Sequence, residues 1–142
     1  MKINSLIRYH IEKLRNLYLD EAKEYLSNNG FKMIGSGCES VVYSKKGFEY
    51  VIKLNYCPFS NTGIHVDIPS DKHFAKYLTF TTSFGHLIIQ EKCEVLKYRD
   101  RNITNFKKFR KWVEAKYSVS DIHFENVGVI NGRFLVIDYT LA

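Results

Sequence analysis

Apolar residues near the amino terminus recur every three or four positions, which is the period of an amphipathic helix. The pattern extends from Ile3 to Leu26. An Asn-Asn-Gly sequence follows at residues 28–30, and such residues commonly end helices. We therefore expect a single amino-terminal helix over residues 3–26, within a segment 1–29.

The pattern becomes β-like between residues 31 and 55. Two apolar runs, at residues 41–43 and 48–54, flank a polar Ser-Lys-Lys-Gly loop, which predicts a hairpin. If Tyr43 faces Phe48, the numbers of opposed residues sum to 91.

In that register, Ser40 pairs with Val51 and Cys38 pairs with Lys53. Side chains alternate between the two faces of a strand, so Ser40, Val42, Val51 and Lys53 are expected to share one face. The first hairpin therefore predicts a lysine beside two apolar side chains.

Three further elements follow. Pro69 and Ser70, with Ser70 as the N-cap, predict a second helix. One face of this helix would carry Phe74, Tyr77, Leu78 and Thr81. A short strand is expected at residues 87–89, and a third helix is expected at about residues 103–116.

A hairpin is predicted at the end of the chain. Asn131 and Gly132 separate apolar runs at residues 127–130 and 133–137, and Asn-Gly between such runs favours a two-residue turn. Opposed residues then sum to 263, so Asn126 faces Ile137 and Asp138 lies beside it.

Asp121 precedes Asn126 by five residues and is expected to approach the same point. Carboxylate and carboxamide oxygens gathered in this way suit a hard cation such as Mg²⁺. The structural alternative is that Asp138 merely ends the last strand.

Gly35, Ser36 and Gly37 are expected to form a glycine-rich turn above the shared face of the first hairpin. Such a turn can point backbone N–H groups at phosphate, and Lys53 would add a cation. Val42 and Val51 would supply an apolar slot. A plain turn without a ligand is the alternative interpretation.

The composition is that of one ordinary globular domain, with 142 residues, 45% hydrophobic and 25% charged. No apolar run approaches the ~20 residues of a membrane-spanning helix. No secretory signal is visible, so we expect a cytoplasmic protein without a membrane partner. Cys38, Cys57 and Cys93 lack metal-type spacing and are expected to be reduced thiols.

The formal net charge is +6 and the isoelectric point is about 9.2. This charge permits attraction to phosphate, nucleic acid or an acidic protein surface. The basic run at residues 107–111, beside Trp112, is interpreted as the solvated face of the third helix, and no nucleic-acid motif accompanies it. We therefore expect no nucleic-acid partner, with an RNA-binding module as the weakest alternative.

Four segments resemble, in the right order, the protein-kinase-like superfamily, and especially its RIO and aminoglycoside-phosphotransferase branches. Residues 34–43, which read IGSGCESVVY, are similar to the glycine-rich loop of that superfamily. The strand with the phosphate-binding lysine is similar to Val-Ile-Lys at residues 51–53. The catalytic loop is similar to DIHFEN at residues 121–126, and the strand with the metal-binding aspartate is similar to VIDY at residues 136–139.

This resemblance implies phosphoryl transfer from ATP with Mg²⁺. Lys53 would hold the α and β phosphates, Asn126 and Asp138 would hold the metal ion, and Asp121 would accept or orient the proton of the substrate hydroxyl. The adenine would lie against the apolar slot and pair with backbone that follows the strand at residues 87–89. The implied nucleotide-binding residues are Gly35, Ser36, Gly37, Ser40, Val42, Val51, Lys53, Glu91 and Cys93.

The implied fold is α+β, with a kinase-like antiparallel sheet, a glycine-rich loop, a reduced helical lower lobe and a catalytic hairpin. We expect one kinase-like domain over residues 1–142, divided into the helix at 1–29, an N-lobe-like part at 30–92 and a reduced C-lobe at 93–142. No activation segment or helical substrate lobe is seen, so the chain resembles a carboxyl-terminally truncated member.

The resemblance is also incomplete at the expected acidic partner of Lys53. No acidic residue lies between Phe74 and Phe84, where the glutamate partner of Lys53 is expected, and Asp71 or Glu39 would have to replace it. We expect an ATP-dependent phosphotransferase that acts on a protein, with a partner or self-association replacing the missing lobe. The alternative is a pseudokinase-like binding or inhibitory protein that acts through protein contacts.

Overall fold

The computed structural model describes residues 3–37, 39–56, 72–95, 103–120, 122, 126–137 and 140–141. The fold is α+β, and the described residues form three helices, a five-stranded antiparallel sheet, a three-stranded sheet that contains a hairpin, and a two-stranded pair. The chain divides into two compact units. Unit 1 comprises Met1–Ser60 and Lys76–Lys92, and unit 2 comprises Asn61–Ala75 and Cys93–Ala142.

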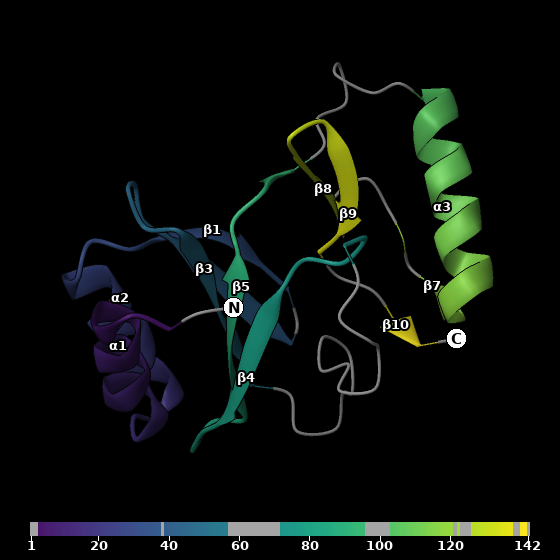
Figure 1. Cartoon of the computed structure of the whole chain (residues 1–142). Coiled ribbons are helices and arrows are strands. Elements are labelled where there is room, and N and C mark those ends of the chain that lie inside the picture. The colour runs from purple at the N-terminus through teal and green to yellow at the C-terminus, as the bar shows by residue number, and fades with distance from the viewer. Residues whose placement is uncertain are drawn as a thin grey trace. The chain divides into compact units, whose positions relative to one another are not determined.

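A five-stranded antiparallel sheet forms the centre of unit 1 (Figure 1). Its strands are β1 (Lys32–Ser36), β2 (Ser40–Ser44), β3 (Tyr50–Asn55), β4 (Tyr77–Thr81) and β5 (His86–Glu91). The order across the sheet is β1-β2-β3-β5-β4. The strand predicted at residues 87–89 is therefore confirmed as β5, and β3 is the central strand.

The prediction of one helix over residues 3–26 is wrong, because the segment forms two helices, α1 (Ser5–Arg15) and α2 (Leu19–Asn28). The Tyr18 N–H donates to a Glu21 carboxylate oxygen at 3.0 Å. This capping bond starts a second helix although the apolar spacing continues across the break.

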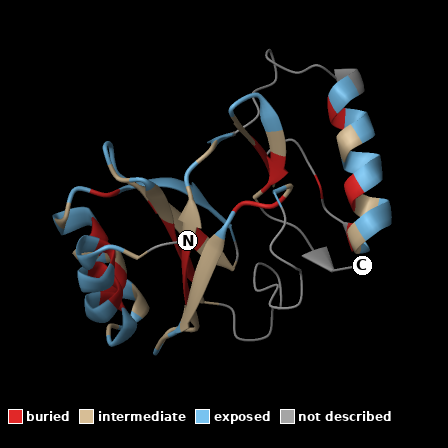
Figure 2. Cartoon of the chain, viewed as in Figure 1, coloured by how far each residue is buried: buried red, intermediate tan, exposed pale blue. Residues whose placement is uncertain are grey.

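The core of unit 1 lies between these two helices and one face of the sheet, and Figure 2 shows the buried positions gathered there. The sheet contributes alternate residues of β2, β3 and β5, as expected for strands that are covered on this face. The buried cluster consists of Ile7, Ile11, Leu14, Ala22, Leu26, Phe31, Val41, Tyr43, Ile52, Leu54, Leu87 and Ile89.

The helix predicted from Ser70 through Thr81 is also wrong, because its second half is strand β4. Leu78 and Phe80 pair with Ile89 and Leu87 of β5. Pairing with a buried neighbouring strand outweighs the local helical spacing of the apolar residues. The predicted start of that helix, at Pro69 and Ser70, lies outside the described residues.

The described residues of unit 2 form α3 (Ile103–Tyr117) and five short strands. β6 (Glu94–Val95), β8 (Val127–Ile130) and β9 (Arg133–Val136) form one antiparallel sheet in the order β6-β8-β9. β7 (Val119–Ser120) pairs with β10 (Thr140–Leu141). The third predicted helix is thus confirmed, and it ends one residue later than expected.

Unit 2 has its own apolar core. The bridge between Phe74 and Val136 joins the segment before β4 to β9, and the Ala75 N–H donates to the Val136 carbonyl at 2.8 Å. The buried cluster consists of Phe74, Phe106, Val113, Val119, Ile122, Val127 and Val136.

The hairpin predicted around Asn131 and Gly132 is confirmed residue by residue. Val127 pairs with Val136 and Ile130 pairs with Arg133, so opposed residues sum to 263 as expected. Asn131 has a φ of 53° and Gly132 has a φ of 74°, which are the positive values that a two-residue turn of this class requires.

Within the part of the chain that the structure describes, no helix has both the length and the apolar character needed to cross a bilayer.

Candidate functional site

The first hairpin has a different register from the predicted one. Val42 pairs with Lys53 and Tyr43 pairs with Ile52, so opposed residues sum to 95 rather than 91. Cys38 therefore does not face Lys53, and Ser40 pairs with Asn55 instead of Val51. The two strands are joined by a longer loop than the sequence pattern indicated.

Phe48 explains the change in register. Its N–H closes a turn by donating to the Lys45 carbonyl at 3.0 Å. Its ring then packs edge-on against Phe31, with ring centroids 5.2 Å apart. Phe48 therefore belongs to the aromatic packing beside the helices and does not start β3.

The predicted sharing of a face nevertheless holds. The register moved by four residues, which is an even number, so every side chain stays on the face that was expected. Val42 and Lys53 are directly opposed, and Ser40 and Val51 lie two residues away on the same face. This face is opposite to the one that packs against α1 and α2, because Val41, Ile52 and Leu54 point into the core.

Lys53 and Asn55 are the polar residues that β3 buries on this second face. The exposed fraction is 9% for Lys53 and 2% for Asn55. Long charged side chains are seldom buried without an anionic or hydrogen-bonding neighbour. A cation held at low dielectric attracts a phosphate much more strongly than a solvated lysine does.

One row of opposed residues crosses all five strands through Lys53. Gly35 faces Val42, Lys53 faces Ile88, and Ile88 faces Thr79. The Thr79 hydroxyl is buried and has no hydrogen-bond partner. The second face therefore combines a cation and a hydroxyl with apolar side chains.

The glycine-rich turn lies later in the sequence than predicted. Gly35 and Ser36 belong to β1 and pair with Val42 and Val41. The turn itself is closed by the Gly37 N–H, which donates to the Ser40 carbonyl at 2.9 Å. The expected turn at Gly35, Ser36 and Gly37 is therefore corrected to residues 37–40, of which Cys38 lies outside the described residues.

The two glycines leave open space beside this turn. A Cβ added at Gly35 or at Gly37 would meet no atom within 4 Å. Neither glycine has the positive φ that would by itself exclude another residue. The space without side chains is where a ligand could approach the backbone closely.

Tyr56 is a residue of this region that the sequence interpretation missed. Its hydroxyl donates to the Gly37 carbonyl at 2.9 Å, and its N–H donates to the Glu39 carbonyl at 2.9 Å. An aromatic residue directly after a strand is too common to indicate such a role. Contact across 19 positions of sequence follows only from the β2–β3 register.

The segment expected to pair with adenine is partly engaged within the protein. The Glu91 N–H donates to the Lys76 carbonyl at 2.8 Å, and a Glu91 carboxylate oxygen accepts from the Lys76 N–H at 3.0 Å. The Lys92 N–H donates to the Glu49 carbonyl at 3.3 Å. These two N–H groups therefore already have protein acceptors.

Cys93 begins unit 2 and packs against β8. A Cβ added at Gly128 would come closer to the Cys93 Sγ than real contacts allow. The Cys93 side chain is half-buried.

The residues expected to hold the metal ion are described only in part. The Ile137 N–H donates to the Asn126 carbonyl at 2.8 Å, so Asn126 faces Ile137 as predicted. Asp121 and Asp138 lie outside the described residues. Among the residues that are described, no group of three or more His, Cys, Asp or Glu side chains could hold a metal ion.

Comparison with known proteins gives no family for this chain. No protein-family model matches it, and no curated protein matches it either.

Proposed function

We propose that the chain is an ATP-dependent phosphotransferase that uses Mg²⁺ and transfers phosphate to a protein. The observation that carries this proposal is the position of Lys53. It lies on the central strand β3, it is 9% exposed, and it is directly opposite Val42 on the face turned away from α1 and α2.

The surroundings of Lys53 support nucleotide binding. Val42 and Val51 offer apolar surface on the same face, and the turn at residues 37–40 follows β1. A backbone turn and a buried lysine are the two features that recur in phosphate sites of this reaction class. The triphosphate would bind to Lys53, and the base would pack on the two valines.

The remaining roles come from the motifs of the second half of the chain. Asn126 and Asp138 provide the oxygen ligands that Mg²⁺ prefers, and the ion would offset the charge of the phosphates. A hydroxyl oxygen of the protein substrate would bond to the γ-phosphorus while the bond to the bridging oxygen of ADP breaks. Asp121 would take the proton that the hydroxyl loses.

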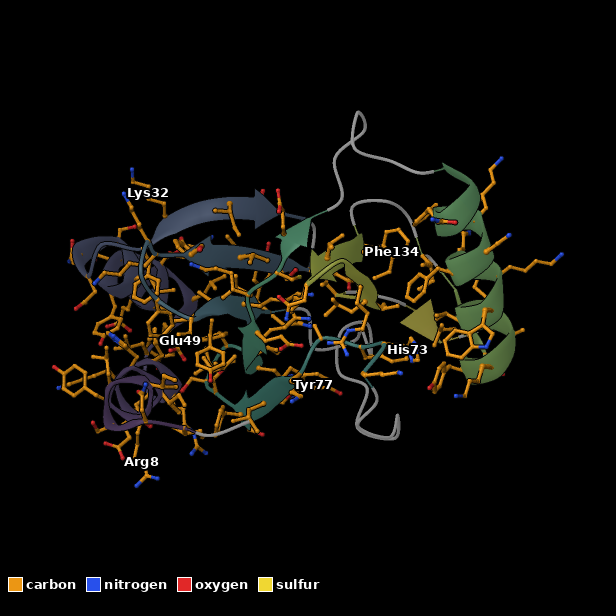
Figure 3. The ribbon with its side chains drawn as sticks, turned by 45° about the horizontal axis from the view of Figure 1, so that its top comes forward. Arg8, Lys32, Glu49, His73, Tyr77 and Phe134 are labelled. Carbon is orange, nitrogen blue, oxygen red and sulfur yellow. The ribbon has the colours of Figure 1, made fainter. Side chains whose placement is uncertain are left out.

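Two variants separate binding from transfer. With Lys53→Ala, we expect the thermal shift caused by ATP with Mg²⁺ and the phosphate transfer to be lost together. With Asp121→Ala, we expect the thermal shift to remain and transfer from radiolabelled ATP to fall by about 10²–10⁴-fold. Lys32→Ala is the matched control, because Figure 3 shows the exposed Lys32 side chain pointing away from its strand β1.

Equal labelling by wild type and Asp121→Ala would overturn the role of Asp121. A wild-type protein that shows no thermal shift with ATP, with or without Mg²⁺, would overturn the proposal as a whole.

A second candidate is a pseudokinase-like protein that works through protein contacts. It is favoured by β4, because the segment Tyr77–Thr81 is a strand where the resemblance implies the helix with the acidic partner of Lys53. A wild-type thermal shift with ATP, together with no transfer to any protein of a cell extract, is the outcome that would select this candidate.

A further inference from the structure

The turn between β1 and β2 is tied to the end of β3 by one side chain. The Tyr56 hydroxyl donates to the Gly37 carbonyl at 2.9 Å. We propose that this hydroxyl is a latch that holds the turn in position for a phosphate, so that Tyr56 is a positioning residue of the nucleotide site. This inference rests on the proposed function, because it takes the ligand of the turn to be a nucleotide phosphate.

Tyr56 makes two hydrogen bonds to the turn. Its N–H donates to the Glu39 carbonyl at 2.9 Å, which extends the β2–β3 ladder by one step. A third bond, from the Gly37 N–H to the Ser40 carbonyl, closes the turn itself. The hydroxyl therefore restrains the Gly37 carbonyl, while the Gly37 N–H is held by the Ser40 carbonyl.

Tyr56 is itself held in place, as a latch must be. It follows Asn55, which is 2% exposed and pairs with Ser40. Its Cα lies beside Gly85. A Cβ added at Gly85 would lie 3.3 Å from the Tyr56 Cα and would also collide with the Asn55 carbonyl. From α2, the Lys23 ammonium lies over the Tyr56 ring, 5.8 Å from its centroid.

The turn needs such a restraint because its glycine has no side chain to pack. A Cβ at Gly37 would meet nothing within 4 Å, so even a side chain at this position would gain no packing. A flexible loop that must be ordered by its ligand binds more weakly than one that is ordered beforehand. The tyrosine bond orders the peptide before the nucleotide arrives.

Tyr56→Phe removes only the hydroxyl and keeps the ring. We expect its dissociation constant for ATP with Mg²⁺ to rise by about threefold to tenfold, which is the size expected for one lost hydrogen bond. We expect its affinity for adenosine to stay unchanged, because adenosine has no phosphate for the turn to bind. Both constants are measured by calorimetry.

Tyr18→Phe is the matched control. Tyr18 is 73% exposed, and its side chain makes no capping hydrogen bond, so the same chemical change there should leave both affinities unchanged. If Tyr56→Phe weakens ATP and adenosine equally, or weakens neither, the latch is refuted. The first result would show a general structural role, and the second would show that the bond does not matter for binding.

Hydrogen exchange tests the latch without any nucleotide. In Tyr56→Phe, we expect the Gly37 amide to exchange several-fold faster, while the amides of β3 keep their protection. An unchanged Gly37 rate would refute the latch even if the wild-type protein binds no nucleotide. If the Gly37 amide exchanges faster in Tyr56→Phe but the wild-type protein binds no nucleotide, Tyr56 does restrain the turn. The proposed function and the role of the turn in phosphate binding would then be overturned.

Discussion

At the scale of single residues, His10 is the buried group with the most distinctive surroundings. It is 6% exposed, and its Nδ1 lies 2.7 Å from the Tyr25 hydroxyl. The rings of Phe31 and Phe48 meet it edge-on, with centroids 5.5 and 6.0 Å away. Burial lowers the pKa of His10 below its usual value, and the positive charge of Lys45 lowers it further.

We predict that the free energy of unfolding falls as the pH drops below about 6.5, the ordinary histidine pKa. The folded protein holds His10 neutral, whereas the unfolded chain binds a proton there, so acid favours unfolding until the pH passes below the folded-state pKa. Above about pH 6.5 both states are neutral at this position and the effect vanishes.

Urea unfolding of wild type and His10→Gln between about pH 8 and pH 5 checks this prediction. Glutamine keeps a hydrogen-bonding group for Tyr25 but does not titrate in this range. The other histidines and the carboxylates contribute equally to both proteins, so the variant should show the flatter pH dependence. Identical slopes would mean that His10 is not responsible.

At the scale of elements, the sequence predicted the features that are set locally and missed those set by distant partners. The hairpin around Asn131 and Gly132 was predictable in full register, because two adjacent residues determine its turn. At the break between α1 and α2, the Tyr18 N–H donates a capping bond to the Glu21 carboxylate. The spacing of apolar residues along the sequence does not reveal such a bond.

The features of the candidate site also fall into those that are set locally and those that are set by distant partners. The face that Lys53 shares with Val42 was predictable, because alternation along a strand survives an even error in register. The strand conformation of β4 was not predictable, because it depends on pairing with β5. Tyr56 was not predictable either, because its partner Gly37 is brought near by the sheet.

Two glycines mark places where elements approach too closely for a side chain. At Gly85, in the turn between β4 and β5, an added Cβ would collide with the Asn55 carbonyl, and φ is +141°. At Gly128, on β8, it would collide mainly with the Cys93 Sγ. The first obstacle is backbone, and the second is the end of a side chain.

We therefore predict different outcomes for the two alanine variants. Gly85→Ala should lose about 2 kcal/mol or more of unfolding free energy, because neither the backbone contact nor the φ can relax cheaply. Gly128→Ala should lose about 1–3 kcal/mol, as overpacked cores do. Adding Cys93→Ala to Gly128→Ala should restore part of that loss.

Chemical denaturation measures these three variants and the single variant Cys93→Ala, and Gly35→Ala is the control, because its Cβ would meet nothing within 4 Å. A double variant as unstable as the sum of its two single variants would contradict the assigned contact between Cys93 and β8.

At the scale of the whole molecule, charge is the property that acts on a ligand from every part of the chain. The net charge is +6. On α3, Lys107, Lys108 and Lys111 are exposed, while Arg110 is paired with Glu114 at 3.0 Å. A positive molecule raises the local concentration of a phosphate ligand, and salt screens this attraction.

If the chain binds ATP as proposed, we predict binding about threefold to tenfold weaker in about 0.5 M salt than in about 0.02 M salt, because the Debye length falls from over 20 Å to under 5 Å. Changing Lys107, Lys108 and Lys111 to Glu lowers the charge by two units each, from +6 to zero. This triple variant should lose most of the salt dependence, and its affinity at high salt should match that of wild type.

Changing the same three residues to Gln, which leaves +3, should give an intermediate dependence. Calorimetry at both salt concentrations measures the affinities. If Lys53 alone governed binding, rather than the net charge, all three proteins would show the same salt dependence.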